Sequence, residues 1–130
     1  MPSESTRFVI AAAQISPVFL DREATIEKAC RTIREAGEKG ARWIVFPEAF
    51  VPTYPFWAWF IPAGESRALR ALYAELVENA VTVPSEATDR LCNAAREAAI
   101  SVAIGINELG PGRGGATSAG APAAHRNVDP

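Results

Sequence analysis

Three short apolar segments, residues 8–15, 43–46 and 100–106, predict strands of a sheet. Within residues 8–15 the apolar positions do not alternate with polar ones, which is typical of a strand covered on both faces. The segment 43–46 follows Gly40 and ends at Pro47, which has no N–H to offer to a neighbouring strand. The pattern therefore predicts three apolar strands, well separated along the chain.

The segments between these strands predict amphipathic helices. Residues 22–38 follow Asp21, a candidate N-cap, and Gly37 and Gly40 are expected to stop this helix. A second helix is expected within residues 64–79, and a third begins after Ser85, a candidate cap. The expected buried stripes are Ile26, Ala29, Cys30 and Ile33 in the first helix, Leu69, Leu72, Tyr73, Leu76 and Val77 in the second, and Leu91, Ala94, Ala95 and Ala98 in the third. Strands alternating with helices predict an α/β fold built in layers.

The composition changes after residue 108. Glycine, alanine and proline supply 13 of the 22 residues from 109 to 130, and this segment holds few large apolar side chains. Too little apolar surface is available to offset the entropy of ordering, so we predict disorder. The expected division is a domain over residues 1–108 and a tail over residues 109–130. We assign no role to His125, which lies in the tail.

Composition and charge exclude several classes of function. A net charge of −2 and a pI near 5.4 give no electrostatic reason to bind nucleic acid or an anionic membrane. Cys30 and Cys92 form neither a disulfide framework nor a metal-binding spacing, so we expect a cytoplasmic protein without a metal. No apolar run approaches the roughly 20 residues of a membrane-spanning helix.

Glu48 is the candidate for chemistry. It follows the predicted strand 43–46 directly and precedes residues 49–60, which are rich in aromatic residues and proline. Ligands of open α/β sheets bind beyond the carboxyl ends of the strands. A carboxylate walled there by aromatic rings loses water and becomes useful as a base. A structural role is the alternative, in which Glu48 caps the next turn or pairs with an arginine.

The stretch around Glu48 resembles the glutamate signature of the nitrilase, or carbon–nitrogen hydrolase, family. The matching positions are Gly40, Ile44, Val45, Phe46, Glu48, Tyr54 and Pro55, while Thr53 stands where the pattern usually has glycine. Residues 56–60 resemble the aliphatic and arylaliphatic nitrilase branch. Residues 13–18 and 104–108 are similar to an opening and a later strand of the family, so the resemblance covers about residues 6–108.

The resemblance implies an αββα sandwich with a catalytic glutamate, lysine and cysteine, and neither a metal nor an organic cofactor. It assigns Glu48 as the general base, and it makes Tyr54 and Trp57 the candidate substrate-binding residues for a small nitrile or amide. The family's members commonly form dimers and larger spirals, which implies a homo-oligomer. The family's lysine and cysteine do not carry over, because no lysine follows Lys39 and both cysteines precede the later strand.

We therefore expect this chain to be the N-terminal portion of a nitrilase-like sandwich and to be catalytically incomplete. We also expect its tail to come from an out-of-frame read of a GC-rich gene. Half of the sandwich would be missing, so a sheet face and a strand edge should be uncovered, and we expect poor solubility or dependence on a partner chain. Two alternatives stay open. One is an active hydrolase, either complemented by another chain or working through an unusual site; the other is a non-catalytic binding or assembly module that uses the aromatic loop 56–60.

Overall fold

The computed structural model describes residues 7–110 and the backbone of residues 125–128, while residues 1–6, 111–124 and 129–130 lie outside the described part. The elements follow the order β1 (Val9–Ala12), α1 (Arg22–Glu38), β2 (Ala41–Val45), α2 (Trp57–Phe60), α3 (Ser66–Glu78), α4 (Glu86–Ala98), β3 (Ser101–Gly105) and β4 (His125–Val128). Strands alternate with helices, which confirms the predicted α/β class. Among the described residues no helix is both long enough and apolar enough to cross a membrane.

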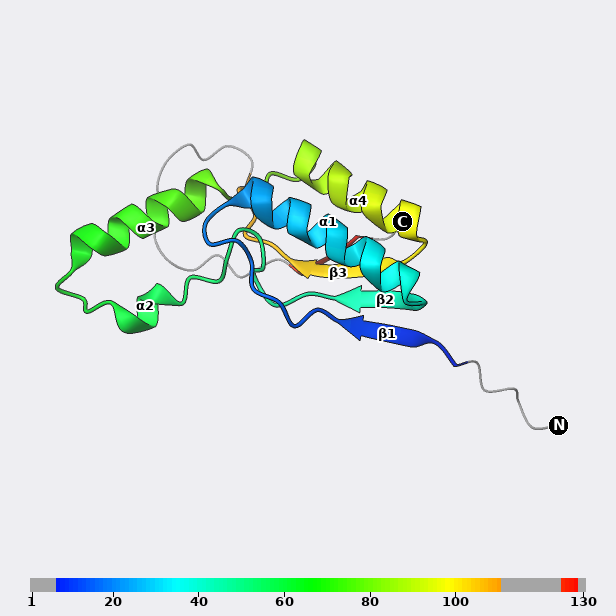
Figure 1. The fold of residues 1–130 in the computed structure, drawn as a ribbon. Helices are drawn as coiled ribbons and strands as arrows, with labels where there is room; N and C mark the ends of the chain where they lie inside the picture. Colours follow the sequence, from blue (N-terminus) through cyan, green and yellow to red (C-terminus); the bar gives the residue numbers. More distant parts are fainter. Residues whose placement is uncertain (1–6, 111–124, 129–130) are drawn as a thin grey trace.

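The four strands form one sheet in the order β1-β2-β3-β4. β1, β2 and β3 are parallel, and β4 runs antiparallel to β3. The carboxyl ends of the three parallel strands therefore lie at one edge of the sheet, on the side of α2 and α3 (Figure 1). This edge is where an open α/β sheet binds ligands.

The core lies between the sheet and two helices, α1 and α4, which pack against each other on the same face of the sheet (Figure 1). Ile26, Ile33 and Leu91 of the helices are buried there, as are Ile44 and Val102 of the strands. The stripes predicted for the first and third helices are therefore confirmed, apart from Ala98, which is half-buried. Removal of these apolar side chains from water is the main force that holds the helices on the sheet.

Local signals set the ends of α1. The Asp21 carboxylate accepts a hydrogen bond from the Ala24 N–H (2.9 Å), so the predicted N-cap is confirmed. Gly40 turns the chain into β2 with a φ of +79°, a conformation that favours glycine. Gly37, however, does not stop the helix: it lies inside α1, and a Cβ there would be 2.9 Å from the Cβ of Ala98. Its role is to let α1 and α4 approach closely.

The opposite face of the sheet is open within the described part of the chain. Ile10, Trp43 and Val45 share this face through the strand register and are 60%, 40% and 45% exposed. The expectation that residues 8–15 are covered on both faces is therefore wrong for the described part of the chain, whose helices α1 and α4 lie on one face and leave Val9 and Ile10 exposed. The expectation of an uncovered face is confirmed, and the outer edge of β1 has no strand partner among the described residues.

The stripe of α3 is not core, contrary to expectation. Only Leu76 is buried, while Tyr73 and Val77 are exposed. The physical reason is the position of α3, which lies beyond the carboxyl ends of the strands and away from the layer formed by α1 and α4 (Figure 1). Helical spacing predicted the element correctly but could not say what would cover its apolar side.

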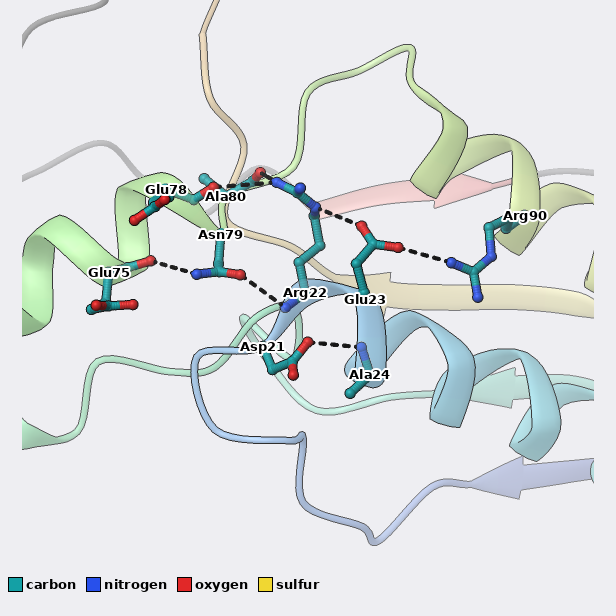
Figure 2. Close-up of polar contacts among 9 residues, drawn as sticks. All are labelled: Asp21, Arg22, Glu23, Ala24, Glu75, Glu78, Asn79, Ala80 and Arg90. Atoms are coloured by element: carbon teal, nitrogen blue, oxygen red, sulfur yellow. Dashed lines mark hydrogen bonds and ion pairs between the residues drawn. The ribbon is translucent and has the colours of Figure 1, made fainter.

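Polar contacts fix the C-terminal end of α3 against the start of α1. Figure 2 shows the Arg22 guanidinium donating to the carbonyl oxygens of Ala80 (3.0 Å) and Glu78 (3.3 Å), and its backbone N–H donating to the Asn79 side chain (3.2 Å). The Glu23 carboxylate, next in sequence, accepts from Arg90 of α4 (3.0 Å). Three helices are thereby tied together at one end of the core.

The structure describes few residues of the tail that was predicted to be disordered. Residues 111–124 and 129–130, which make up most of it, lie outside the described residues. The structure differs from the prediction at His125–Val128, which forms β4. The physical reason is that the backbone N–H and C=O groups along the outer edge of β3 need hydrogen-bond partners, and β4 supplies them by antiparallel pairing.

Candidate active site

Glu48 lies just beyond the carboxyl end of β2, where the sequence placed it. Phe46 still pairs with β3 through its N–H and the Ala103 carbonyl (2.8 Å), and Pro47 then ends the pairing. The Glu48 side chain is exposed, and within the described residues its carboxylate makes no hydrogen bond or ion pair. Neither the cap nor the arginine pair of the structural alternative is found there. The desolvating wall of aromatic rings is also not found, since the carboxylate faces water.

The backbone around Glu48 lies directly on β3. A Cβ placed on Gly105 would be 2.9 Å from the carbonyl oxygen of Pro47, 3.0 Å from the carbonyl carbon of Glu48 and closer still to the amide nitrogen of Ala49. Only a residue without a side chain fits under this turn. Sequence reasoning did not single out Gly105, although a glycine inside an apolar strand is a signal of close backbone approach.

The chain after Glu48 forms a buried segment, residues 49–53, which we call the glutamate loop. It begins with Ala49 in a left-handed conformation (φ +47°) and then pairs with the end of β3. The Val51 N–H donates to the Gly105 carbonyl (3.2 Å), and the Asn107 N–H donates to the Val51 carbonyl (2.8 Å). Glu48 thus stands exposed at the start of a loop whose other residues are fixed in the core.

The Asn107 side chain adds a second link to the glutamate loop. Its amide nitrogen donates to the carbonyl oxygens of Thr53 (3.0 Å) and Val51 (3.3 Å). Thr53 itself is buried. Sequence reasoning cited Asn107 only as part of a matching segment and missed this role, because the contact joins residues more than fifty positions apart.

The two candidate substrate-binding residues differ in their surroundings. Tyr54 is exposed, whereas Trp57 is only 3% exposed and its ring packs edge-on against Phe19 and Tyr73 at centroid distances of 5.8 Å. The Trp57 Nε1–H has no hydrogen-bond acceptor among the described residues. No hydrogen bond brings either residue to Glu48 within that part of the chain. Short helix α2, which carries Trp57, was not foreseen in the aromatic loop.

The cysteines lie away from Glu48, on the helical side of the sheet. Cys30 is buried between α1 and α4, and its thiol lies 3.6 Å from the Arg90 carbonyl oxygen as a hydrogen-bond donor. Burial raises the pKa of the Cys30 thiol above its ordinary 9.0, although the charges of Arg90 and Arg34 oppose the rise. A thiol held in its protonated form is a poor nucleophile. Cys92 is half-buried on α4.

Other groups of the triad are also not assembled at this edge of the sheet. Lys28, on α1, donates to the Ser16 carbonyl (2.7 Å), and Lys39 lies at the C-terminal end of α1, next to the amino end of β2. Across residues 7–110 no group of three or more His, Cys, Asp and Glu side chains could hold a metal ion. Among the described residues, this edge of the sheet therefore offers one exposed carboxylate and the loop that follows it.

Comparison with known proteins shows which family this chain resembles. The family model described as carbon-nitrogen hydrolase matches residues 9–119. The chain is 48% identical over 103 residues to Nitrilase 2 of an unknown prokaryotic organism, covering 79% of this chain and 32% of that protein. It is 44% identical over 92 residues to a nitrilase of Bacillus sp., covering 71% of this chain and 26% of that protein.

An arylacetonitrilase of Aspergillus niger gives a similar result, with 39% identity over 104 residues, 80% of this chain and 29% of that protein. The matches leave the larger part of each relative without a counterpart. The chain thus spans about a third or less of the length of the curated relatives that it matches.

Proposed function

The chain belongs to the carbon–nitrogen hydrolase family, and we propose that it supplies the general base of a nitrile-hydrolysing site, with Glu48 in that role. The observation that carries this proposal is the place of Glu48: an exposed carboxylate without a partner among the described residues, at the sheet edge where ligands bind, on a buried loop. Relatives named nitrilase and arylacetonitrilase favour a nitrile as substrate.

The proposed reaction begins when the Glu48 carboxylate takes the proton of a cysteine thiol. The thiolate attacks the nitrile carbon, the substrate nitrogen takes up the proton that Glu48 holds, and a thioimidate forms. Glu48 then activates a water molecule that attacks the same carbon, and ammonia leaves a thioester. A second water breaks the thioester into the carboxylic acid and the free thiol. A lysine ammonium stabilises the negative charge that develops on the substrate nitrogen.

We further propose that this chain alone is catalytically incomplete. Cys30 is buried on the far side of the sheet with a raised pKa, and the described residues place neither lysine nor thiol at Glu48. Tyr54 and Trp57 stay our candidates for contact with the substrate. Cytoplasmic location and a homo-oligomeric state stay predictions from the sequence.

A second function, a binding module without catalysis, is favoured by one observation. Trp59 and Phe60 of α2 are 78% and 79% exposed, and the Phe60 ring contacts that of Phe56 at a centroid distance of 6.4 Å. Large exposed rings mark surfaces that other molecules cover. A stable folded monomer, a defined co-purifying partner or a saturable change in tryptophan fluorescence on adding a ligand would support this function; a chain that shows none of these would speak against it.

The test of the first function measures ammonia released from a panel of small nitriles. We compare the purified chain with Glu48→Ala and with Glu38→Ala, a control that removes an exposed carboxylate at the end of α1. We expect no ammonia from any of the three. Release that disappears only in Glu48→Ala would refute incompleteness while supporting the base.

Absence of ammonia alone does not test Glu48, so the chain is also refolded with a fragment of the Bacillus sp. nitrilase that lacks the segment matched by this chain. We expect ammonia release to appear with the chain and with Glu38→Ala, and to fall by at least a hundredfold with Glu48→Ala. Equal release with Glu48→Ala would refute Glu48 as the base.

A further inference from the structure

We propose that Asn107 is a positioning residue for Glu48, acting through the glutamate loop; this inference rests on the proposed function of that carboxylate. Asn107 follows β3 and does not touch Glu48 by any hydrogen bond. Instead it holds the backbone that continues from Glu48. The inference concerns how the base keeps its place at the edge of the sheet.

The side-chain amide of Asn107 is chemically suited to this role. It donates to two carbonyl oxygens of the loop, those of Val51 (3.3 Å) and Thr53 (3.0 Å). An amide NH₂ has two N–H groups and can bridge two acceptors, which a hydroxyl or a carboxylate cannot do. The orientation of the amide follows from its partners, because the opposite one would place its oxygen against two carbonyl oxygens.

The hydrogen bonds of Asn107 affect Glu48 because the glutamate loop, which connects Glu48 to the bonded carbonyl groups, is stiff. Ala49, Val51 and Thr53 are each at most 3% exposed, so their backbone cannot shift without disturbing the core. On the other side, Gly105 lies against the turn that contains Glu48. The backbone at Glu48 is therefore held from two directions by the end of β3, by Gly105 against the turn and by Asn107 along the chain.

A catalytic base must be held at the correct distance from the group that it deprotonates. Proton transfer requires the carboxylate within about 2.6–3.2 Å of the group it deprotonates. Displacing a catalytic group by about 1 Å can lower the rate by a factor of about a hundred. The Glu48 side chain makes no hydrogen bond among the described residues, so the loop contributes by setting the position of the Glu48 backbone, from which the carboxylate must reach its target.

The first test follows backbone and carboxylate directly by NMR, without need for turnover. Asn107→Leu removes both donors at similar size, Asn107→Ser keeps one donor, and Asn93→Leu changes an asparagine on the exposed side of α4 as the control. In Asn107→Leu we expect amide exchange at Val51 to be about tenfold faster, as loss of hydrogen bonds implies. We also expect a shifted and broadened Glu48 carboxyl resonance.

A merely structural role would give another result. Exchange would then rise by the same factor at Val51 and at Ile33 in the centre of α1, and the Glu48 resonance would keep its position. That outcome, or wild-type behaviour of Glu48 in Asn107→Leu, would overturn the inference. Asn107→Ser should lie between wild type and Asn107→Leu, and it keeps the test valid if the leucine variant does not fold.

The second test uses the refolded complex with the Bacillus sp. nitrilase fragment. We expect Asn107→Leu to lower kcat by at least tenfold with little change in KM, because the base is misplaced while substrate binding stays intact. A raised KM at unchanged kcat would overturn the inference. If the complex shows no activity with any variant, the proposed function fails, and the NMR result still decides the role of Asn107.

Discussion

Replacing Gly105 with alanine tests the close approach between β3 and the turn at Glu48. The substitution adds one methyl group, which would lie 2.9 Å from the Pro47 carbonyl oxygen and nearer to the Ala49 amide nitrogen. Both neighbours are backbone atoms, so no side chain can rotate away. The turn must move off the sheet, and the Val51 N–H to Gly105 carbonyl bond, already 3.2 Å long, must lengthen.

Two terms oppose each other in the expected effect. Forcing a methyl group into packed backbone costs about 1–3 kcal/mol, and a lengthened hydrogen bond adds about 1 kcal/mol. The smaller conformational freedom of alanine in the unfolded chain returns about 0.4–1 kcal/mol. We therefore expect Gly105→Ala to lower the free energy of unfolding by about 2–3 kcal/mol.

The assay is urea unfolding followed by circular dichroism. The matched control is Gly64→Ala, because a Cβ at Gly64 meets no atom within 4 Å and should leave stability unchanged or raise it slightly. The change in the midpoint, at constant slope, reports the difference in stability. If Gly105→Ala were as stable as Gly64→Ala, the turn at Glu48 would not rest on β3, and the fixed position of the base would lose one of its two supports.

Two further predictions concern the exposed face and the buried thiol. Val45→Lys, on the open face of the sheet, should reduce aggregation and binding of a hydrophobic dye while changing the free energy of unfolding by no more than about 0.5 kcal/mol. Ile44→Lys, on the covered face, should unfold the chain. Equal effects of the two substitutions would refute the assignment of faces. The raised pKa of Cys30 means that the folded state retains the thiol proton where the unfolded state loses it, so this contribution to stability is complete below pH 9.0 and falls as the pH rises above it. Urea unfolding between pH 8 and 10 should therefore show a steeper loss in the wild type than in Cys30→Ala, and parallel curves would contradict this.

Local signals in the sequence predicted α1 and α4 well. The ends of α1 agree with the predicted segment, because a capping carboxylate at Asp21 and a regular apolar stripe are properties of the helix itself. α4 begins directly after Ser85 and buries its alanine-rich side as predicted, but the predicted cap is not made by the Ser85 hydroxyl, which has no hydrogen-bond partner among the described residues; the Ser85 N–H donates to the Thr88 hydroxyl instead. Such signals act within a few residues, and a single sequence contains them completely.

Properties that depend on distant partners were predicted less well. The stripe of α3 has the same spacing as that of α1, yet only Leu76 of it is buried, because spacing does not determine which element lies opposite. The place of Glu48 followed from the end of a strand, but its exposure did not. The support from Gly105 and Asn107 comes from more than fifty residues away, and pairing across such distances leaves only a weak local signal, here a glycine within an apolar strand.

The open face and the exposed carboxylate have one physical cause. Successive residues of β3 face opposite sides of the sheet, so Gly105 lies on the same face as Ser101 and Ala103. Those two residues pair with Trp43 and Val45 of β2, which lie on the open face. The turn at Glu48 lies over Gly105 and hence on that face. Whatever layer buries Trp43 and Val45 would also reduce the access of water to Glu48, and burial is the condition that makes a carboxylate an effective base. In the proposed function, the step that completes the core therefore also activates the base, so suppression of dye binding to the open face should accompany the recovery of ammonia release on refolding with the nitrilase fragment.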